Sequence, residues 1–224
     1  AVSHYASPYL TIYKRSGDTF TKLIDPAILP AGNAYTAPAF SGDTRYLAVA
    51  HLNPPYITIY KRSGDTFTKL TNPATLPTGT WARSVAWSPD GQYMSVTHQN
   101  TPFVTIYKRS GDTFTKLTNP ASLPPTNAYA VTWSPDGQYM VVGHDSSPYV
   151  TIYKRSGDTF TKVPNPSPNP GGNVRGMAYS PDNKYLVIAH YDNSNMTIYK
   201  AGTGTANPGS LIVGGTMESD TLLV

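Results

Sequence analysis

The chain has 224 residues, 39% of them hydrophobic and 13% charged, and a formal net charge of +4. It has no apolar run near the roughly 20 residues that a membrane-spanning helix requires, and without cysteine it cannot gain stability from disulfides. The 21 prolines and 18 glycines indicate many turns rather than long helices, and so predict an all-β protein.

The positive net charge does not form a patch of one sign. Most basic residues belong to repeated pairs such as Lys61-Arg62, and most acids are turn aspartates such as Asp65 and Asp90. We expect the two signs to share one face and largely to cancel there. Because nucleic-acid binders concentrate one sign, the charge pattern argues against a nucleic-acid partner.

The first four residues, Ala1 to His4, match the ends of later strands such as 47–51, so the chain starts in the middle of a repeat. There is no initiator methionine and no signal peptide, and we therefore expect a processed form or an excerpt of a longer product. A longer parent chain would allow a larger ring of repeats.

A twelve-residue stretch, Thr-Ile-Tyr-Lys-Arg-Ser-Gly-Asp-Thr-Phe-Thr-Lys, recurs along the chain. Copies begin at Thr11, Thr58, Thr105 and Thr151, and a shortened copy begins at Thr197, which is a spacing of 46 or 47 residues. Such a period indicates one duplicated supersecondary unit. We expect a single domain over 1–224, with a closing or docking tail at 201–224. The expected repeats are about 1–34, 35–81, 82–127, 128–173 and 174–200.

Each complete repeat is predicted to form four short strands. In one copy these are 127–133, 139–144, 149–153 and 159–163. Ser134-Pro135-Asp136-Gly137 supplies the proline and glycine of a tight hairpin turn, and Gly157 supplies another. Alternating apolar residues mark the strands between these turns. The repeat is therefore a four-stranded antiparallel meander.

One such sheet cannot bury both of its faces, but sheets stacked radially can bury each face on a neighbour. Small residues such as Ala130 on the first strand suit a crowded central axis, and the lysine that ends the fourth strand suits an exposed edge. These patterns predict a β-propeller of four-stranded antiparallel blades.

The tail predicts how the ring closes. Ser210 to Val213 is expected to be the outer strand of the fifth blade, and Thr221 to Val224 the missing inner strand of the first. The expected propeller thus has five blades closed by the C-terminal strand.

The histidines all occupy one position of the repeat, seven residues before the Thr-Ile-Tyr stretch. A ring of imidazoles could bind a metal or sense pH. One histidine per blade on a second strand is too widely spaced to share a metal, so we expect structural, neutral rings that bond the backbone of an adjacent loop. These structural histidines are His4, His51, His98, His144 and His190.

Two other repeat positions differ from copy to copy, and they are therefore not dictated by the fold. One follows the histidine and the other lies four residues before the aromatic of the inner strand. Both should lie on one rim, where aromatic rings suit a carbohydrate or protein ligand. The alternative is that these rings only pin the proline-rich loops. The candidate rim residues are Tyr5, Tyr35, Trp81, Arg83, Tyr129, Arg175 and Tyr191.

The sequence offers no familiar catalytic motif. The inner strands carry no carboxylate, so a calcium or acid site in the central channel is not expected. The Ser-Pro-Asp-Gly residues are explained by their turns, and no nucleotide-phosphate motif is present. These observations predict a protein that is not an enzyme and that carries no cofactor and no metal.

The unit Val-Thr-Trp-Ser-Pro-Asp-Gly-Gln-Tyr, followed by an apolar strand and Val-Thr-Ile-Tyr-Lys, resembles the WD40-type propeller repeat over residues 1–200. The Tyr-Lys-Arg-Ser-Gly-Asp-Thr-Phe stretch further resembles WD40-like virion and surface proteins of tailed bacteriophages and bacteria. That resemblance implies a non-enzymatic binding or structural propeller on a virion or extracellular surface. Its partners would be other virion or surface proteins, or a host glycan or receptor. Two alternatives stay open: a lectin-like glycan-binding module and a propeller hydrolase or lactonase.

Overall fold

The computed structural model describes residues 1–78, 80–191, 195–201 and 211–213, and within these ranges the regular structure is entirely β. Four antiparallel sheets of four strands follow one another, each a meander in which sequence neighbours pair. No helix in the described ranges is long and apolar enough to cross a membrane. The β-propeller of four-stranded antiparallel blades is therefore confirmed.

The strands are as follows. The second blade contains β5 (Ala39–Phe40), β6 (Tyr46–Ala50), β7 (Ile57–Ser63) and β8 (Thr66–Lys69). The third contains β9 (Ala82–Trp87), β10 (Tyr93–His98), β11 (Val104–Ser110) and β12 (Thr113–Lys116). The fourth contains β13 (Ala128–Trp133), β14 (Tyr139–His144), β15 (Val150–Ser156) and β16 (Thr159–Val163). The fifth contains β17 (Asn173–Tyr179), β18 (Tyr185–Tyr191), β19 (Met196–Ala201) and β20 (Leu211–Val213).

The first blade is less complete than the others. It consists of β1 (Val2–Ser3) paired with β2 (Leu10–Thr11), and β3 (Tyr13–Ser16) paired with β4 (Thr19–Lys22). By position in the repeat, β1 is the second strand of a blade and β4 is the fourth. The third strand is divided at Ile12 into β2 and β3. The described residues of this blade include no inner strand.

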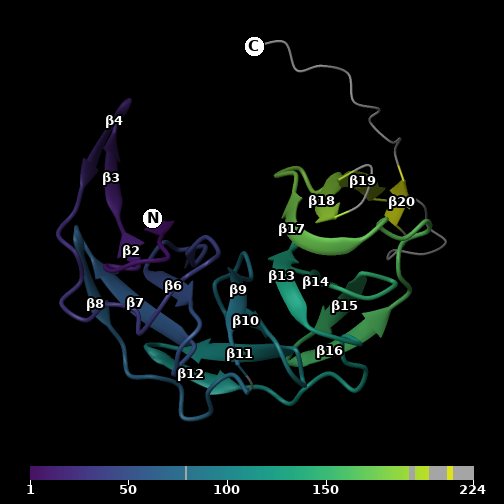
Figure 1. Cartoon of the computed structure of the whole chain (residues 1–224), viewed down its shortest axis with the longest axis horizontal. Helices are drawn as coiled ribbons and strands as arrows, with labels where there is room; N and C mark the ends of the chain where they lie inside the picture. Colours follow the sequence, from purple (N-terminus) through teal and green to yellow (C-terminus); the bar gives the residue numbers. More distant parts are fainter. Residues whose placement is uncertain (79, 192–194, 202–210, 214–224) are drawn as a thin grey trace.

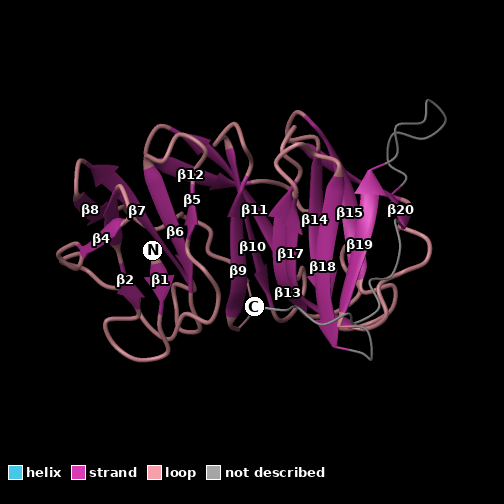
Figure 2. Cartoon of the chain, turned by 90° about the horizontal axis from the view of Figure 1, so that it is seen from above, coloured by secondary structure: helices cyan, strands magenta, loops and turns pink. Residues whose placement is uncertain are grey.

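The blades form an arc that runs from the β3–β4 hairpin to the fifth blade and stays open between these two ends (Figure 1). The inner strands β9, β13 and β17 lie side by side near the centre of the arc, and the outer strands lie at its periphery. The turned view shows the sheets standing next to one another (Figure 2). Residues at the end of each inner strand are thereby gathered around one axis.

The core consists of layers between successive blades. Between the second and third blades, Tyr46 and Ile59 pack against Trp87 and Phe114. The rings of Tyr46 and Phe114 are 6.1 Å apart in an edge-to-face arrangement. Burial of one such aromatic side chain stabilises the fold by about 1.5–3 kcal/mol. The same layer recurs between the third and fourth blades, because Tyr93, Trp133 and Phe160 occupy equivalent positions.

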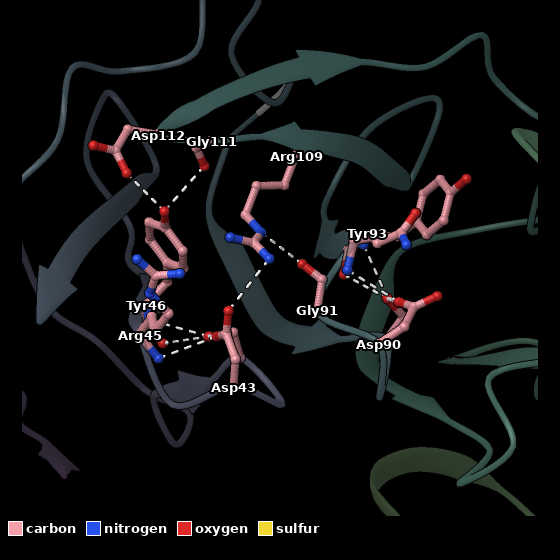
Figure 3. Close-up of polar contacts among 12 residues, drawn as sticks. Asp43, Arg45, Tyr46, Asp90, Gly91, Tyr93, Arg109, Gly111 and Asp112 are labelled. Atoms are coloured by element: carbon pink, nitrogen blue, oxygen red, sulfur yellow. Dashed lines mark hydrogen bonds and ion pairs between the residues drawn. The ribbon is translucent and has the colours of Figure 1, made fainter.

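The turn after the first strand, which is Ser41-Gly42-Asp43-Thr44 in the second blade and Ser-Pro-Asp-Gly in the third, does more than close a hairpin. In the second blade Asp43 accepts a hydrogen bond from the backbone N–H of Arg45, and its other oxygen pairs with Arg109 of the third blade at 3.3 Å (Figure 3). Asp90 repeats this arrangement with Arg155 at 2.8 Å. Each such aspartate thus fixes its own turn and ties its blade to the next.

The predicted end of the chain is confirmed in one respect. Leu211 to Val213 pairs antiparallel with β19 as the outer strand of the fifth blade. The predicted closing strand, 221–224, lies outside the described residues, and the arc formed by the described residues is not closed.

Candidate functional site

Three inner strands carry a β-bulge at the same register. His98 pairs with Ala82 and Thr97 pairs with Ser84, which leaves Arg83 as an extra, unpaired residue. A bulge bends its strand and re-aims the extra side chain. The fourth and fifth blades repeat this irregularity, and there Tyr129 and Arg175 are the extra residues. One of the two divergent sequence positions is therefore the position that the bulge releases from the sheet.

The bulged side chains meet. The guanidinium carbon of Arg83 lies 5.5 Å from the ring centre of Tyr129, and that of Arg175 lies 3.8 Å from the same ring. Both distances are within the range of a cation–π contact. Tyr129 therefore holds one cationic side chain from each neighbouring blade.

Further rings extend this cluster at both ends. Arg83 also lies 4.9 Å from the ring of Trp81 and 5.6 Å from that of Tyr35, and Arg175 lies 5.4 Å from the ring of Tyr191. Tyr5 meets Tyr35 edge to face at 5.5 Å. The structure thus joins the seven predicted rim residues into one continuous cluster, which we call the rim cluster.

The rim cluster surrounds a cavity of about 340 Å³. Its lining residues are Tyr35, Thr36, Arg83, Tyr129 and Arg175. Thr36 occupies the bulge position of the second blade by sequence, so four blades contribute the same repeat position to one hollow. A cavity with convergent polar groups among aromatic walls has the form of a small-molecule site.

A carboxylate reaches the cluster from a second repeat position. Asp145 directly follows His144 at the end of β14 and accepts a hydrogen bond from the Tyr129 hydroxyl at 3.3 Å. Its other oxygen, Oδ1, is buried without a hydrogen-bond partner in the described structure, as are Thr36 Oγ1 and Arg83 Nε. Buried polar atoms are normally hydrogen-bonded, so each of these three atoms has the capacity for one further hydrogen bond.

Sequence reasoning did not select Asp145 or Thr36 as site residues. It looked for carboxylates on the inner strands, where there are none, whereas Asp145 lies at the end of the second strand. The available signal was the position in the repeat. Asp145 directly follows the histidine, and Thr36 lies four residues before the aromatic of the inner strand; these are the two divergent positions considered for the rim.

Trp81 has a backbone conformation that is uncommon for a bulky residue. Its φ of 62° lies in the left-handed region, which is costly for such side chains and is found mostly where surrounding contacts enforce it. The residue immediately precedes β9 and is 45% exposed. This conformation presents the indole to Arg83 at the edge of the cavity.

The five histidines do not belong to this site. In each blade Nε2 pairs with the hydroxyl of the threonine seven residues later, at distances from 2.7 to 3.1 Å. The expected partner was the backbone of a loop; His98 adds such a contact, from Nδ1 to the Gln99 carbonyl at 3.4 Å. The described residues include no group of three or more His, Cys, Asp or Glu side chains placed to hold a metal.

Burial sets the charge state of the histidines in the second, third and fourth blades, His51, His98 and His144. It lowers the pKa of His51 to about 4 and lowers the pKa values of His98 and His144 as well. A neutral imidazole can hydrogen-bond to the threonine hydroxyl without the cost of a buried charge. The contact ties the second strand of each blade to its third strand.

Comparison with known proteins defines the class to which this propeller belongs. Residues 12–128, just over half of the chain, match the family described as lactonase, 7-bladed beta-propeller. The chain belongs to this family. No curated protein matches the chain.

Two solved structures share the fold. One is the periplasmic gluconolactonase PpgL of Pseudomonas aeruginosa, with 17% identity and a TM-score of 0.64 over 95% of this chain and 64% of that one. The other, from Bacteroides uniformis ATCC 8492, is assigned as a 6-phosphogluconolactonase, with 17% identity and a TM-score of 0.66 over 91% of this chain and 63% of that one. The chain therefore spans less than two thirds of the length of either neighbour.

These findings correct the predicted role. The resemblance to phage virion and surface proteins was wrong, and so was the prediction of a non-enzymatic virion or adhesion component, because the matching family is one of lactonases. The physical reason is that the repeated motif serves blade packing. Tyr60, Phe67 and their equivalents in the third and fourth blades are buried between sheets, as a propeller of any function requires. The family description also gives seven blades, whereas the prediction gave five.

Proposed function

We propose that the protein is a lactonase that hydrolyses the cyclic ester of a sugar acid at the rim cluster. Membership of the lactonase family supports a hydrolase. The observation that carries the proposal is the convergence of Arg83, Tyr129 and Arg175 from bulges on three inner strands onto one cavity. That cavity is large enough for one sugar ring.

The two arginines supply the electrophilic part of the reaction. Attack on a lactone carbonyl puts negative charge on its oxygen, and preorganised cationic donors at that place lower the barrier. Arg83 and Arg175 both line the cavity and both contact Tyr129, which restricts their guanidinium groups to its wall. The Nε–H of Arg83 has no partner in the described structure, so it can donate a hydrogen bond to the developing oxyanion.

Tyr129 and Asp145 supply the proton transfers. A water molecule forms a bond to the carbonyl carbon and loses a proton to the carboxylate of Asp145, whose Oδ1 is buried and unpartnered. The ring C–O bond breaks, and the leaving oxygen takes a proton from the Tyr129 hydroxyl. Asp145 returns its proton to Tyr129 along their 3.3 Å hydrogen bond. The product is an open-chain hydroxy acid, and both side chains regain their starting states.

The aromatic side chains suit the substrate class. The apolar C–H faces of a sugar pack on flat rings, whose edges leave the hydroxyl groups free to form hydrogen bonds. Trp81 and Tyr35 lie on one side of the cavity with Arg83, and Tyr191 lies on the other with Arg175. We further propose that the protein acts outside the cytoplasm, as the periplasmic gluconolactonase does.

The direct test is acid release from glucono-δ-lactone, measured with a pH indicator against spontaneous hydrolysis. A saturable rate that grows with protein concentration is expected, and Arg83→Gln should lower kcat by about 100-fold or more. The matched control is Arg62→Gln, an exposed arginine whose side chain donates to the Gly64 carbonyl of its own hairpin. No rate above the spontaneous one, or equal losses in both variants, would overturn the proposal.

A further inference from the structure

Trp81 lies next to the cavity of the rim cluster but does not line it. Its indole ring is 4.9 Å from the guanidinium carbon of Arg83, which is a lining residue, and Trp81 is 45% exposed. It belongs to the third blade, which stands between two blades of four strands each (Figure 1). A flat apolar ring is therefore presented to solvent directly outside the proposed lactone site.

The loop that carries Trp81 does not need a ring at this position. The equivalent residues of the second, fourth and fifth blades, six positions before the aromatic of the inner strand, are Ala34, Asn127 and Asn173. Those loops reach their inner strands without an indole at that place. The other copies therefore give no support to the alternative that the indole only pins its loop.

The backbone of Trp81 adds a second observation. Its φ of 62° lies in the left-handed region, where asparagine is several-fold enriched and a bulky residue is an outlier. Asn127 and Asn173 are of the type that tolerates this region, yet neither has a positive φ. The costly conformation thus falls on the copy that carries an indole. Strain of this kind clusters at positions that contact ligands.

An amide group lies beside the indole. His98 at the end of β10 pairs with Ala82 at the start of β9. Because the two strands are antiparallel, Gln99 continues one strand where Trp81 precedes the other. Gln99 is partly exposed and occupies the repeat position that Asp145 occupies in the fourth blade. A primary amide both donates hydrogen bonds to hydroxyl groups and accepts them.

We propose that the substrate is the lactone of a disaccharide or a longer glycan, whose reacting ring occupies the cavity while the next sugar packs on Trp81 and bonds to Gln99. This inference rests on the proposed lactonase function and narrows its substrate class. The next sugar is a closed ring with an apolar C–H face, which suits an indole. Arg83 lines the cavity and contacts the indole, so its donors lie between the two sugars.

The first test compares two substrates. Cellobiono-δ-lactone and glucono-δ-lactone share the reacting ring and differ by one glucose unit. After correction for spontaneous hydrolysis, we expect kcat/KM to favour the disaccharide lactone by about tenfold or more, because a well-packed tryptophan contact is worth at least this much. Equal values for the two lactones would overturn the inference.

Trp81→Asn tests the ring itself. The fourth and fifth blades carry asparagine at this position, so the variant should fold, and a thermal melt checks this. Because Trp81 also contacts Arg83, the readout is the ratio of the two kcat/KM values, not either rate alone. The ratio should fall to about one, and Trp81→Phe should keep part of the preference. An unchanged ratio in Trp81→Asn would contradict the proposal.

Tyr13→Asn is the matched control. Tyr13 is 44% exposed and lies on β3, outside the rim cluster, so the ratio should stay at its wild-type value. Gln99→Leu introduces the residue that the second blade has at this position, Leu52, and should lower the ratio about threefold. If Tyr191→Asn removes the preference and Trp81→Asn does not, the assignment of the second sugar to Trp81 is wrong.

Binding of the two products gives a readout without turnover. Calorimetry should show that cellobionate binds more tightly than gluconate, and that Trp81→Asn removes the difference. If this difference appears but neither lactone is hydrolysed, the proposed lactonase function fails and the sugar site at Trp81 stands. If both lactones are hydrolysed equally and both products bind equally, the lactonase function stands and the inference is wrong.

Discussion

The guanidinium carbon of Arg175 lies 3.8 Å from the centre of the Tyr129 ring, and both residues are the unpaired members of β-bulges on adjacent inner strands. The contact fixes the direction of a long cationic side chain that is otherwise exposed. A planar guanidinium stacks on an aromatic ring in a way that an ammonium group does not reproduce. The contact thus couples the positions of a candidate electrophile and a candidate acid.

Arg175→Lys should therefore reduce activity although it keeps the charge. Without the planar contact the cation is not held against Tyr129, and we expect kcat for glucono-δ-lactone to fall by about tenfold or more. Steady-state kinetics on the purified variant measures this. Lys154→Arg, a conservative change on a hairpin outside the cluster, is the control, and equal rates for wild type and Arg175→Lys would show that the stacking has no catalytic role.

Asp145→Asn should abolish most of the activity and leave the fold intact. The amide keeps the shape of the side chain but cannot take a proton, and a lost general base costs about 100-fold or more. The pH dependence of kcat/KM separates this effect from misfolding: the acidic limb of the wild-type profile should disappear in the variant. An unchanged profile would assign proton transfer to another group.

The lowered pKa values of His51, His98 and His144 predict how stability depends on pH. Burial lowers the pKa of His51 from 6.5 to about 4, so between these values the unfolded chain binds a proton that the native protein does not. Stability from this group is complete above pH 6.5 and is lost as the pH falls toward 4. His98 and His144 shift in the same direction. A loss of about 1 kcal/mol lowers the melting temperature of a chain of this size by about 2–4 °C.

Thermal melts between pH 8 and pH 5 measure this effect. The turn aspartates do not obscure it. Although burial alone would raise the pKa of Asp43, hydrogen bonds from Ser41 and Arg45 and the charge of Arg109 hold it below its usual value. Its stabilising contribution is therefore present above about pH 4 and is lost only below that. A melting temperature that stays constant from pH 8 to pH 5 would rule out the proposed role of the histidines.

Arg155→Ala should weaken the contact between the third and fourth blades. The side chain pairs with Asp90 at 2.8 Å and its guanidinium carbon lies 4.9 Å from the Tyr93 ring. Because this pair is partly buried, we expect a loss of about 1–2 kcal/mol in the free energy of unfolding. Arg62→Ala, at the equivalent but exposed position of the second blade, should change it by about 0.5 kcal/mol or less. Urea denaturation distinguishes the two variants.

Gly42→Ala should destabilise the protein for a steric reason. A Cβ atom at this position would lie 2.0 Å from the carbonyl oxygen of Pro89 in the next blade. Because that oxygen belongs to the backbone, the clash can be relieved only if the two blades move apart. We expect a cost of about 1–3 kcal/mol or more. At Gly176 the nearest atom to a new Cβ would be that of Ala189, at 3.8 Å, so Gly176→Ala serves as the control in the same thermal melts.

The sequence predicted the blades well because their signals are local. Alternation, the Ser-Pro-Asp-Gly turn and the regular period each depend on a few neighbouring residues, and they repeat. It also selected residues that the structure brings into contact with one another, since positions that diverge between near-identical copies are free of packing constraints. Their joint geometry was not predictable, because the bulges that turn Arg83, Tyr129 and Arg175 inward depend on pairing with β10, β14 and β18.

The contribution of Asp145 was hidden for a similar reason. Its carboxylate reaches the cluster only through the hydroxyl of Tyr129, which comes from the neighbouring strand of the same sheet. The role of the protein was mispredicted because the most repetitive residues, such as Tyr107 and Phe114, are buried between blades and carry no information about a ligand.

The bulges also allow the residues of the rim cluster to vary independently of the residues that pack the blades together. A bulged residue pairs with no residue opposite it, so Arg83, Tyr129 and Arg175 can differ in size and charge while the flanking residues keep their register. The third, fourth and fifth blades therefore each contribute one interchangeable side chain to the hollow. Under the proposed function, substitutions at these positions should change substrate preference one blade at a time, in a combinatorial manner, while the packing between the blades stays unchanged.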